Sequence, residues 1–329
     1  MRKATLFFNL LLCGALLSPI HALAQAEELL KAIVKIRALI PAGAHTADVL
    51  GTQREGHGIV VDSKGHILTA GYLIIESESI EVTGPDGRKV KAAFAGYDHA
   101  SGFGILRTEE LLNVTPMKIG SAEDLKEGAP AIVAGHGGLE AAIGSRVVAR
   151  REFTGYWEYI LDNAIFTAPA YAQFAGAALI GPEGELLGVG SLFTQLSVPG
   201  LGMLPCNVFI PIDLLPPILD DLISTGRSRQ PARPWLGINA EETHGRVFVT
   251  RITAGGPAAE VGLQADDLIL AVNGKPVAGL SDFYRKVWAA GSAGVEVTLD
   301  ILKGMEIKAV TVRTGDRTKF LLRTPKKTI

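Results

Sequence analysis

The sequence predicts a mainly β protein, and three observations support that class. Glycine and proline are frequent, with 38 and 17 of the 329 residues, and short apolar runs recur along the chain. Residues 177–189 have the pattern of a β-hairpin, since two apolar runs flank the Gly-Pro-Glu-Gly turn at 181–184. Residues 58–69 show the same pattern around an Asp-Ser-Lys-Gly turn. The length of the chain suggests two or three domains.

The N-terminus has the pattern of a secretory signal peptide over residues 1–26. Arg2 and Lys3 precede an apolar stretch at 4–20, and small residues follow, with cleavage expected after Ala24 or Ala26. An uncleaved anchor is the alternative, but the apolar stretch is short for a membrane span and polar and helix-breaking residues interrupt it. The mature protein is therefore expected to be periplasmic or secreted.

Cysteine content and charge limit the further possibilities. After cleavage only Cys206 would remain, so no intrachain disulfide is predicted, and Cys206 is expected to be a small buried residue. No later run is long and apolar enough to cross a membrane. The net charge of −2 gives no general nucleic-acid footprint. The basic end, residues 317–329, is expected to be a solvated tail, with contact to an anionic surface as the alternative.

The elements between residues 27 and 234 are short and mostly strands. The segment 27–40 begins as a helix and continues as an apolar strand, and 41–56 is expected to be a loop. A second hairpin is predicted around the Gly-Pro-Asp-Gly turn at 84–87. Later strands are predicted at 143–150, 156–161, 163–168 and 208–215, followed by a helix at 214–225 and a linker at 226–234.

A separate unit is predicted after the linker. It begins near Trp235. The expected elements are a strand at 247–253, a short helix at 256–263, a strand and turn at 266–277, a helix at 282–290, and strands at 295–302 and 308–314.

The hairpins resemble those of the HtrA/Do (DegP-like) family of trypsin-fold serine proteases. Residues 58–69 are similar to the family segment GSGVIIDKDGYILT, and 184–189 take the place of GEVIGI. The segment 117–135 is similar to PLPLGDSDKLRVGDWVLAIG, and 208–213 to the closing strand FAIPID. The resemblance implies two six-stranded trypsin-like β-barrels over residues 27–228.

The resemblance places a residue unable to do the family's chemistry at each triad position. Tyr72 takes the place of the catalytic histidine, and a phenol with a pKa near 10 is a poor base at neutral pH. Gly102 takes the place of the aspartate that orients the base, and Ala175 that of the nucleophilic serine. Tyr72 is instead expected to be a core aromatic whose hydroxyl bonds to the backbone.

The oxyanion loop also departs from the family pattern. The family needs a glycine two residues before the serine, so that backbone N–H groups turn toward the developing anion. Gln173 stands there, followed by Phe174, and a residue with a side chain reaches the left-handed conformation only at a cost. The oxyanion hole is therefore predicted to be dismantled along with the nucleophile.

Residues 229–316 resemble a PDZ domain in the circular arrangement found in HtrA-type proteins. The segment Pro-Trp-Leu-Gly-Ile at 234–238 resembles its carboxylate-binding loop. A PDZ groove captures a peptide by strand addition, and its loop amides bind the terminal carboxylate. The resemblance assigns the carboxylate to Leu236, Gly237 and Ile238, and the start of the pairing strand to Asn239.

The residues that wall this groove depend on the rotational phase of the helix at 282–290. Phe283 and Val287 are four apart on one helix face and are candidates to wall the groove, which would favour an apolar last residue on the ligand. Burial of one or both in the core is the open alternative.

The histidines do not form a metal site in the sequence, and no cofactor is predicted. His57, His66, His99 and His136 are expected near the loops that frame the former active site, solvated or bonded locally. No pair has the i,i+4 spacing of a helical metal site. Asp98 and His99 with Ser101 could replace a triad only if neighbours on an extended chain faced one another, which they do not.

These observations predict an extracytoplasmic HtrA-like pseudoprotease. It would bind C-terminal or unfolded peptide segments through its PDZ domain, as a scaffold or regulator in protein quality control. Two alternatives stay open, an active serine endopeptidase with a rearranged site and a holdase chaperone that uses the vacant cleft. The resemblance also implies homo-trimers or hetero-oligomers with an active HtrA-type protease.

Overall fold

The computed structural model describes residues 19–198 and 202–321, and its contacts divide the chain into two compact units. Unit 1 contains most of the chain up to Ser228, and unit 2 contains residues 43–45, 152–162 and the C-terminal part from Arg229. The predicted signal peptide lies outside the described residues up to position 18, and Ala24 and Ala26 fall in α1 (Pro19–Leu30).

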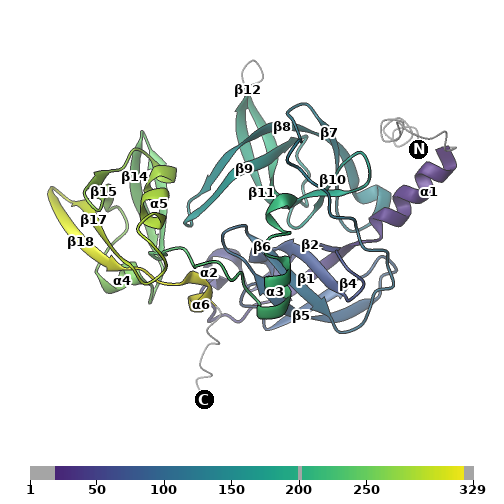
Figure 1. Ribbon diagram of the computed structural model, residues 1–329, viewed down its shortest axis with the longest axis horizontal. Helices are drawn as coiled ribbons and strands as arrows, with labels where there is room; N and C mark the ends of the chain where they lie inside the picture. The colour runs from purple at the N-terminus through teal and green to yellow at the C-terminus, as the bar shows by residue number, and fades with distance from the viewer. Residues whose placement is uncertain (1–18, 199–201, 322–329) are drawn as a thin grey trace. The chain divides into compact units, whose positions relative to one another are not determined.

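The first barrel of unit 1 is a closed ring of antiparallel strands (Figure 1). Its order is β1-β2-β3-β6-β5-β4. In β1, buried Ile36 and Ala38 alternate with exposed Lys35 and Arg37, which is the period of a strand with one face on a core. The strands are β1 (Ile33–Leu39), β2 (Gln53–Val60), β3 (His66–Ala70), β4 (Ser79–Thr83), β5 (Lys89–Tyr97) and β6 (Phe103–Thr108).

The second barrel is also closed, in the order β10-β11-β12-β9-β8-β7. The predicted hairpin at 177–189 forms β10 and β11, with Ala178 opposite Val189 in register. The strands are β7 (Pro130–Ala134), β8 (Ala142–Gly155), β9 (Tyr159–Ala168), β10 (Ala178–Ile180), β11 (Leu186–Val198) and β12 (Gly202–Pro211). The expectation of two six-stranded barrels is confirmed.

Short helices connect and flank the two barrels. They are α2 (Ala47–Leu50), η2 (Gly71–Leu73), η3 (Gly138–Ala141), η4 (Ile212–Leu214) and α3 (Leu219–Thr225). The helix α3 packs against β5, where a Cβ atom on Gly96 would lie 2.5 Å from the Leu222 carbonyl oxygen. Gly226 ends this helix in the left-handed conformation, as a C-terminal glycine commonly does.

Unit 2 is built on an antiparallel sheet in the order β13-β14-β15-β17-β18, with β16 paired to β15. The helix α5 buries Leu280, Phe283, Tyr284 and Val287, the i, i+3, i+4, i+7 stripe of an amphipathic helix. The elements are β13 (Ile238–Thr243), β14 (Arg246–Ile252), α4 (Pro257–Glu260), β15 (Leu268–Val272), β16 (Lys275–Pro276), α5 (Leu280–Trp288), β17 (Glu296–Lys303), β18 (Glu306–Arg313) and α6 (Arg317–Leu321).

Two boundaries differ from those expected from the sequence. Residues 152–162, the turn between β8 and β9 with its flanks, group with unit 2 although they fall inside the predicted protease domain. The expected tail begins instead as the helix α6, because Phe320 packs on Trp235 with ring centroids 4.8 Å apart and Leu321 is buried. Positions 322–329 lie outside the described residues.

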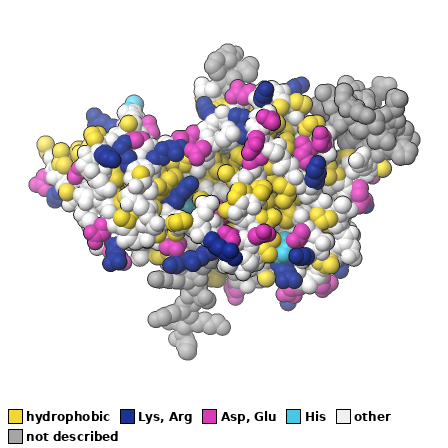
Figure 2. Space-filling view, in the orientation of Figure 1, with side chains coloured by type: hydrophobic (Ala, Val, Ile, Leu, Met, Phe, Trp, Pro, Cys, Tyr) yellow, Lys and Arg dark blue, Asp and Glu magenta, His cyan; other side chains and the backbone are white. Residues whose placement is uncertain are grey.

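The surface carries both signs of charge. On the face in Figure 2, Lys and Arg side chains are interspersed with Asp and Glu, in keeping with the net charge of −2.

None of the described helices is long and apolar enough to cross a membrane.

Candidate functional site

Tyr72, at the position of the family's catalytic base, makes a hydrogen bond that suits a structural role. It lies in η2 directly after β3, and its hydroxyl donates to the Ser191 carbonyl oxygen at 2.9 Å. Burial raises the pKa of this phenol well above its ordinary value, so the hydroxyl stays protonated and donates. The hydroxyl is thus bonded to the backbone as expected, while the residue as a whole is partly buried and does not belong to the fully buried core.

Gly102 is bonded to the residue that precedes Tyr72. Its carbonyl accepts the Gly71 amide at 2.8 Å, and its own amide donates to the Asp98 carbonyl at 2.8 Å. Asp98 also accepts the Ser101 amide through its side chain at 2.7 Å. The carboxylate at Asp98 therefore closes a local turn, and nothing there orients a base.

Ala175 lies in a tightly held turn before β10. Its carbonyl accepts the His57 amide, and the next amide, from Gly176, donates to the Gly190 carbonyl, both at 2.8 Å. Gly176 has a φ of +73°, and a Cβ atom there would lie 1.9 Å from the His57 carbonyl oxygen. Gly190 is the neighbour in sequence of Ser191, whose carbonyl accepts the Tyr72 hydroxyl. These hydrogen bonds bring the positions of Tyr72, Gly102 and Ala175 together in one region of unit 1.

The loop before Ala175 does not have the conformation that an oxyanion hole requires. Gln173 is exposed and is not among the described non-glycine residues with a positive φ. The Phe174 carbonyl instead accepts the Ala177 amide at 3.0 Å, which closes a turn. The backbone of Gln173 hydrogen-bonds to the His57 side chain.

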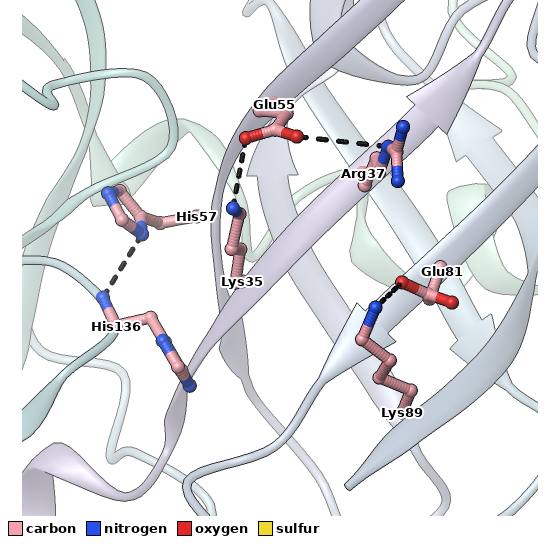
Figure 3. A network of polar contacts seen from close by, with 7 residues as sticks. All are labelled: Lys35, Arg37, Glu55, His57, Glu81, Lys89 and His136. Atoms are coloured by element: carbon pink, nitrogen blue, oxygen red, sulfur yellow. Dashed lines mark hydrogen bonds and ion pairs between the residues drawn. The ribbon is translucent and has the colours of Figure 1, made fainter. Parts of the chain in front are cut away.

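A buried histidine lies beside this loop (Figure 3). His57 is 6% exposed, and its Nδ1 accepts the His136 amide at 3.0 Å. Burial lowers the pKa of His57 to about 4, and the neighbouring His136 adds to this effect. His57 is therefore neutral at pH 7, and the expectation that it is a solvated loop residue is wrong because β2 carries it inward.

His66 and His99 are bonded locally, whereas His136 Nε2 lies 3.0 Å from the carbonyl oxygen of the distant Gly84. His66 is buried and its Nδ1 lies 2.6 Å from an Asp62 carboxylate oxygen, while His99 Nδ1 lies 3.0 Å from the Tyr97 hydroxyl. Ser101 is buried too, and its hydroxyl accepts the Phe103 amide at 3.2 Å, so it is not poised as a nucleophile. Across residues 19–198 and 202–321, no group of three or more His, Cys, Asp or Glu side chains is placed to hold a metal ion.

Exposed ion pairs lie on the strands of the first barrel, near His57 (Figure 3). Lys35, opposite His57 in register, pairs with Glu55 at 2.9 Å and lowers the pKa of that carboxyl group. Lys89 pairs with Glu81 at 2.9 Å. Each such surface pair contributes about 0–1 kcal/mol, so these contacts shape the surface more than they stabilise it.

The loop that begins unit 2 binds a carboxylate within the described structure. The amides of Leu236, Gly237 and Ile238 donate to the side chain of Glu158 at 2.8, 2.8 and 3.1 Å. Gly237 has a φ of +80°, which turns successive amides to the same side. The predicted carboxylate-binding residues are thus brought together on one carboxylate, and that carboxylate belongs to this chain.

The strand after the loop, β13, begins at Ile238 and includes Asn239. Asn239 lies opposite Arg251 in the β13–β14 ladder, and a bulge separates it from Ala240. The Ala240 amide donates to the Tyr156 carbonyl at 2.8 Å. Ala240, rather than Asn239, therefore supplies the first strand amide to the segment that lies along β13.

Phe283 and Val287 are both buried in the core of unit 2. They are 0% and 1% exposed, and they belong to one hydrophobic cluster that also includes Ile160 of β9. Of the two alternatives left by the sequence, burial is the one observed, because α5 turns its whole apolar stripe inward.

Glu158 was not found from the sequence. It is 2% exposed, and burial raises its pKa to about 7, while the three loop amides and the charge of Arg317 act in the opposite direction. The turn Tyr156-Trp157-Glu158 has no motif that marks it. The one available signal is a charged residue inside an otherwise apolar strand pattern at 156–161.

Comparison with known proteins agrees with this architecture. Residues 56–189 match the model of a trypsin-like peptidase domain, and residues 234–314 match the model of a PDZ domain. The periplasmic pH-dependent serine endoprotease DegQ of Escherichia coli is 27% identical over 75% of this chain and 56% of its own length. The periplasmic serine endoprotease DegP of Salmonella typhimurium is 26% identical over 78% of this chain and 55% of its own. The chain spans about half the length of the curated relatives it matches.

Solved structures share the fold. The HtrA-type protease AlgW with decapeptide matches with a TM-score of 0.53 and 20% identity, covering 91% of this chain and 98% of its own. The serine endoprotease from Yersinia pestis matches with a TM-score of 0.52 and 23% identity, covering 92% of this chain and 99% of its own. With a trypsin-like peptidase domain, a PDZ domain and DegQ and DegP among its relatives, the chain is an HtrA/DegP-like family protein.

Proposed function

We propose that this chain is an extracytoplasmic pseudoprotease that binds peptide C-termini through its PDZ domain, as a scaffold or regulator in protein quality control. The proposal separates two properties of the family, peptide capture and peptide-bond hydrolysis. It assigns the first to this chain and not the second.

The observation that carries the binding function is the set of amides on Glu158. Three consecutive N–H groups, from Leu236, Gly237 and Ile238, converge on the oxygens of one carboxylate. A loop that satisfies a side-chain carboxylate in this way has the donors to satisfy a C-terminal one. Carboxylate recognition by this loop therefore rests on hydrogen bonds that the fold makes.

Three features support the absence of hydrolysis. The Tyr72 hydroxyl donates a hydrogen bond to a backbone carbonyl, which does not suit a proton acceptor. Ala175 has no atom that can attack a carbonyl carbon, and Gly102 has no carboxylate. Neither the nucleophile nor the base of an acyl transfer is available at these positions.

The relatives support the cellular setting. DegQ and DegP are periplasmic endoproteases by name, and the predicted signal peptide at residues 1–26 directs this chain to the same side of the membrane. The partners in this proposal are protein C-termini, and the chain forms homo-trimers or mixed oligomers with an active HtrA-type protease. Light scattering of the purified chain, alone and with such a protease, tests the assembly.

Peptide capture is tested by comparing free acids with amides. Fluorescein-labelled decapeptides ending in Val, Leu, Ile or Phe are titrated against the full mature chain, each as the free acid and as the C-terminal amide. Amidation removes the charge that the loop amides accept and is expected to weaken binding by about 1.5–3 kcal/mol, roughly 10- to 150-fold. Equal affinities for the two forms would exclude carboxylate recognition.

A further inference from the structure

The segment Tyr156–Glu158 lies in the PDZ groove in the register of a bound peptide. Glu158 contacts the loop through the amides up to Ile238, and two residues earlier the Tyr156 carbonyl accepts the amide of Ala240, two residues beyond Ile238. Equal steps in opposite directions are the geometry of antiparallel strand addition. The Glu158 side chain takes the place that a terminal carboxylate takes in a captured peptide.

This contact belongs to unit 2 and is closed from several sides. Residues 152–162 group with the PDZ unit, and Ile160 of the same segment is buried with Phe283 and Val287 of the helix α5. The guanidinium of Arg317 donates to the Trp157 carbonyl at 2.6 Å. The chain's own segment thus occupies the carboxylate loop and packs into the same hydrophobic cluster as the helix α5.

An ion-paired arginine holds the two flanks of the segment. Arg285 of α5 contacts the carboxylates of both Glu152 and Asp162. These side chains are 37–72% exposed, so the pairs contribute little binding energy.

The backbone at Glu158 is held in an uncommon conformation. Its φ is +57°, in the left-handed region that residues other than glycine, asparagine and aspartate rarely adopt. Such residues persist where the surroundings hold them, and they occur at ligand clamps and switches. The uncommon backbone conformation and the three loop amides thus occur at the same residue.

We propose that Glu158 is an internal ligand that closes the PDZ groove, so that a peptide with a free C-terminal carboxylate binds only by displacing it. This inference rests on the proposed function, since it concerns the regulation of the same loop. The amides of Leu236, Gly237 and Ile238 satisfy one carboxylate at a time. Binding of a peptide and docking of Glu158 are mutually exclusive, and each weakens the other by the same factor.

The loss of apparent affinity for a peptide is set by the fraction of chains in which Glu158 occupies the groove. If the closed form outnumbers the open form by about ten to one, the apparent affinity for a peptide falls by about tenfold. A variant that cannot close recovers that factor without any new contact to the peptide. The difference between closed and open chains is therefore measurable with one peptide.

The test uses the full mature chain with Glu158→Gly and a matched control, Asp266→Gly. Glycine removes the carboxylate without opposing the positive φ, so the turn between β8 and β9 keeps its backbone. Asp266 is also an acidic residue of unit 2 with a positive φ, +71°, but it is exposed and lies outside the groove. The control therefore reproduces the chemical change without touching the loop.

The first readout is hydrogen exchange of the loop amides without any peptide. The amides of Leu236 and Gly237 are expected to exchange at least tenfold faster in Glu158→Gly than in the wild type, and at the wild-type rate in Asp266→Gly. Equal rates in all three chains would overturn the proposal, because Glu158 would not be the acceptor of these amides in solution.

The second readout separates this inference from the proposed function. A fluorescein-labelled decapeptide ending in Val is expected to bind Glu158→Gly at least tenfold more tightly than the wild type or Asp266→Gly. Equal tight binding to all three chains would overturn the closure and leave the proposed function standing. Faster exchange in Glu158→Gly with no binding of the acid to any chain would overturn the proposed function and, with it, displacement by a peptide.

Discussion

The Tyr72 hydroxyl donates a 2.9 Å hydrogen bond to the carbonyl of Ser191, and through it the first barrel is joined to β11 of the second. The resemblance to the HtrA/Do family implies a catalytic base at this position. The observed hydrogen bond links the two barrels within unit 1.

Removal of this hydroxyl is expected to destabilise the protein. Tyr72→Phe leaves the buried Ser191 carbonyl without its donor, which costs about 1–2 kcal/mol of the free energy of unfolding. Urea unfolding monitored by circular dichroism measures the change. The control Tyr156→Phe alters a 41%-exposed ring and should shift the value by less than about 0.5 kcal/mol. No difference between the two variants would remove the structural role assigned to Tyr72.

Restoring single triad residues is expected to leave the chain inactive. Triad members act as a unit, so Ala175→Ser or Tyr72→His alone stays at background. The triple variant with Gly102→Asp should recover little, since Gly102 has a φ of +87° and Gln173 does not present an oxyanion hole. Casein turnover by Ala175→Ser alone, above that of the wild type, would show that a working base already lies beside position 175.

The glycine of the carboxylate loop should be intolerant of a branched side chain. In Gly237→Val a Cβ atom would lie 3.3 Å from both Pro257 and Trp235, at a φ of +80°, so the loop must shift. The acid-over-amide preference is expected to fall by at least tenfold in fluorescence polarisation. Gly245→Val has a similar φ of +71° in the turn after β13 with open space around it, so it tests strain without obstructing the loop. Loss of the preference in both variants would mean that strain alone explains it.

Closure of the groove should depend on pH in a defined direction. Burial raises the pKa of Glu158 to about 7 in the closed form, whereas a free glutamate titrates near 4.3. The closed form therefore binds more protons than the open form between these values, and raising the pH from about 5 to 8 weakens closure, by at most roughly 3 kcal/mol.

Two other polar groups face this carboxyl group, and neither reverses the sign. Arg317 contributes a cation, and burial raises the pKa of Tyr284, which stays neutral through this range. Exchange of the Leu236 and Gly237 amides, corrected for intrinsic rates, is expected to speed up with pH and level off above about pH 7. Glu158→Gln should remove the dependence. Stronger protection at pH 8 than at pH 5 would contradict the assigned pKa.

The hairpins were predictable because local patterns encode them, whereas the two barrels, the PDZ unit and its loop were implied by the resemblance to the HtrA/Do family. Alternating apolar residues and glycine turns specify hairpins over a few residues, as at 58–69 and 177–189. The loop 236–238 was located by the short motif at 234–238, which resembles the carboxylate-binding loop of a PDZ domain. Features of this kind depend on neighbours in sequence, so one chain suffices to find them.

Other features depend on contacts between distant segments. Glu158 meets its partners 78 to 80 residues away, and no local rule places the turn between β8 and β9 against the loop at 236–238. The start of α5 at Leu280 decides that Phe283 and Val287 face inward. In the helix α6, Phe320 packs against Trp235, which lies 85 positions earlier in the chain. The basic composition of 317–329 does not indicate that contact.

Hydrolysis of casein by the full mature chain tests the central claim, that this chain binds without cutting. Fluorescein-labelled casein is incubated with the chain, and a fluorophosphonate probe is added to a parallel sample. The account predicts release of fluorescence at the rate of a protein-free blank and no labelled serine in this chain. Turnover that the probe abolishes, with a labelled serine identified by mass spectrometry, would contradict it.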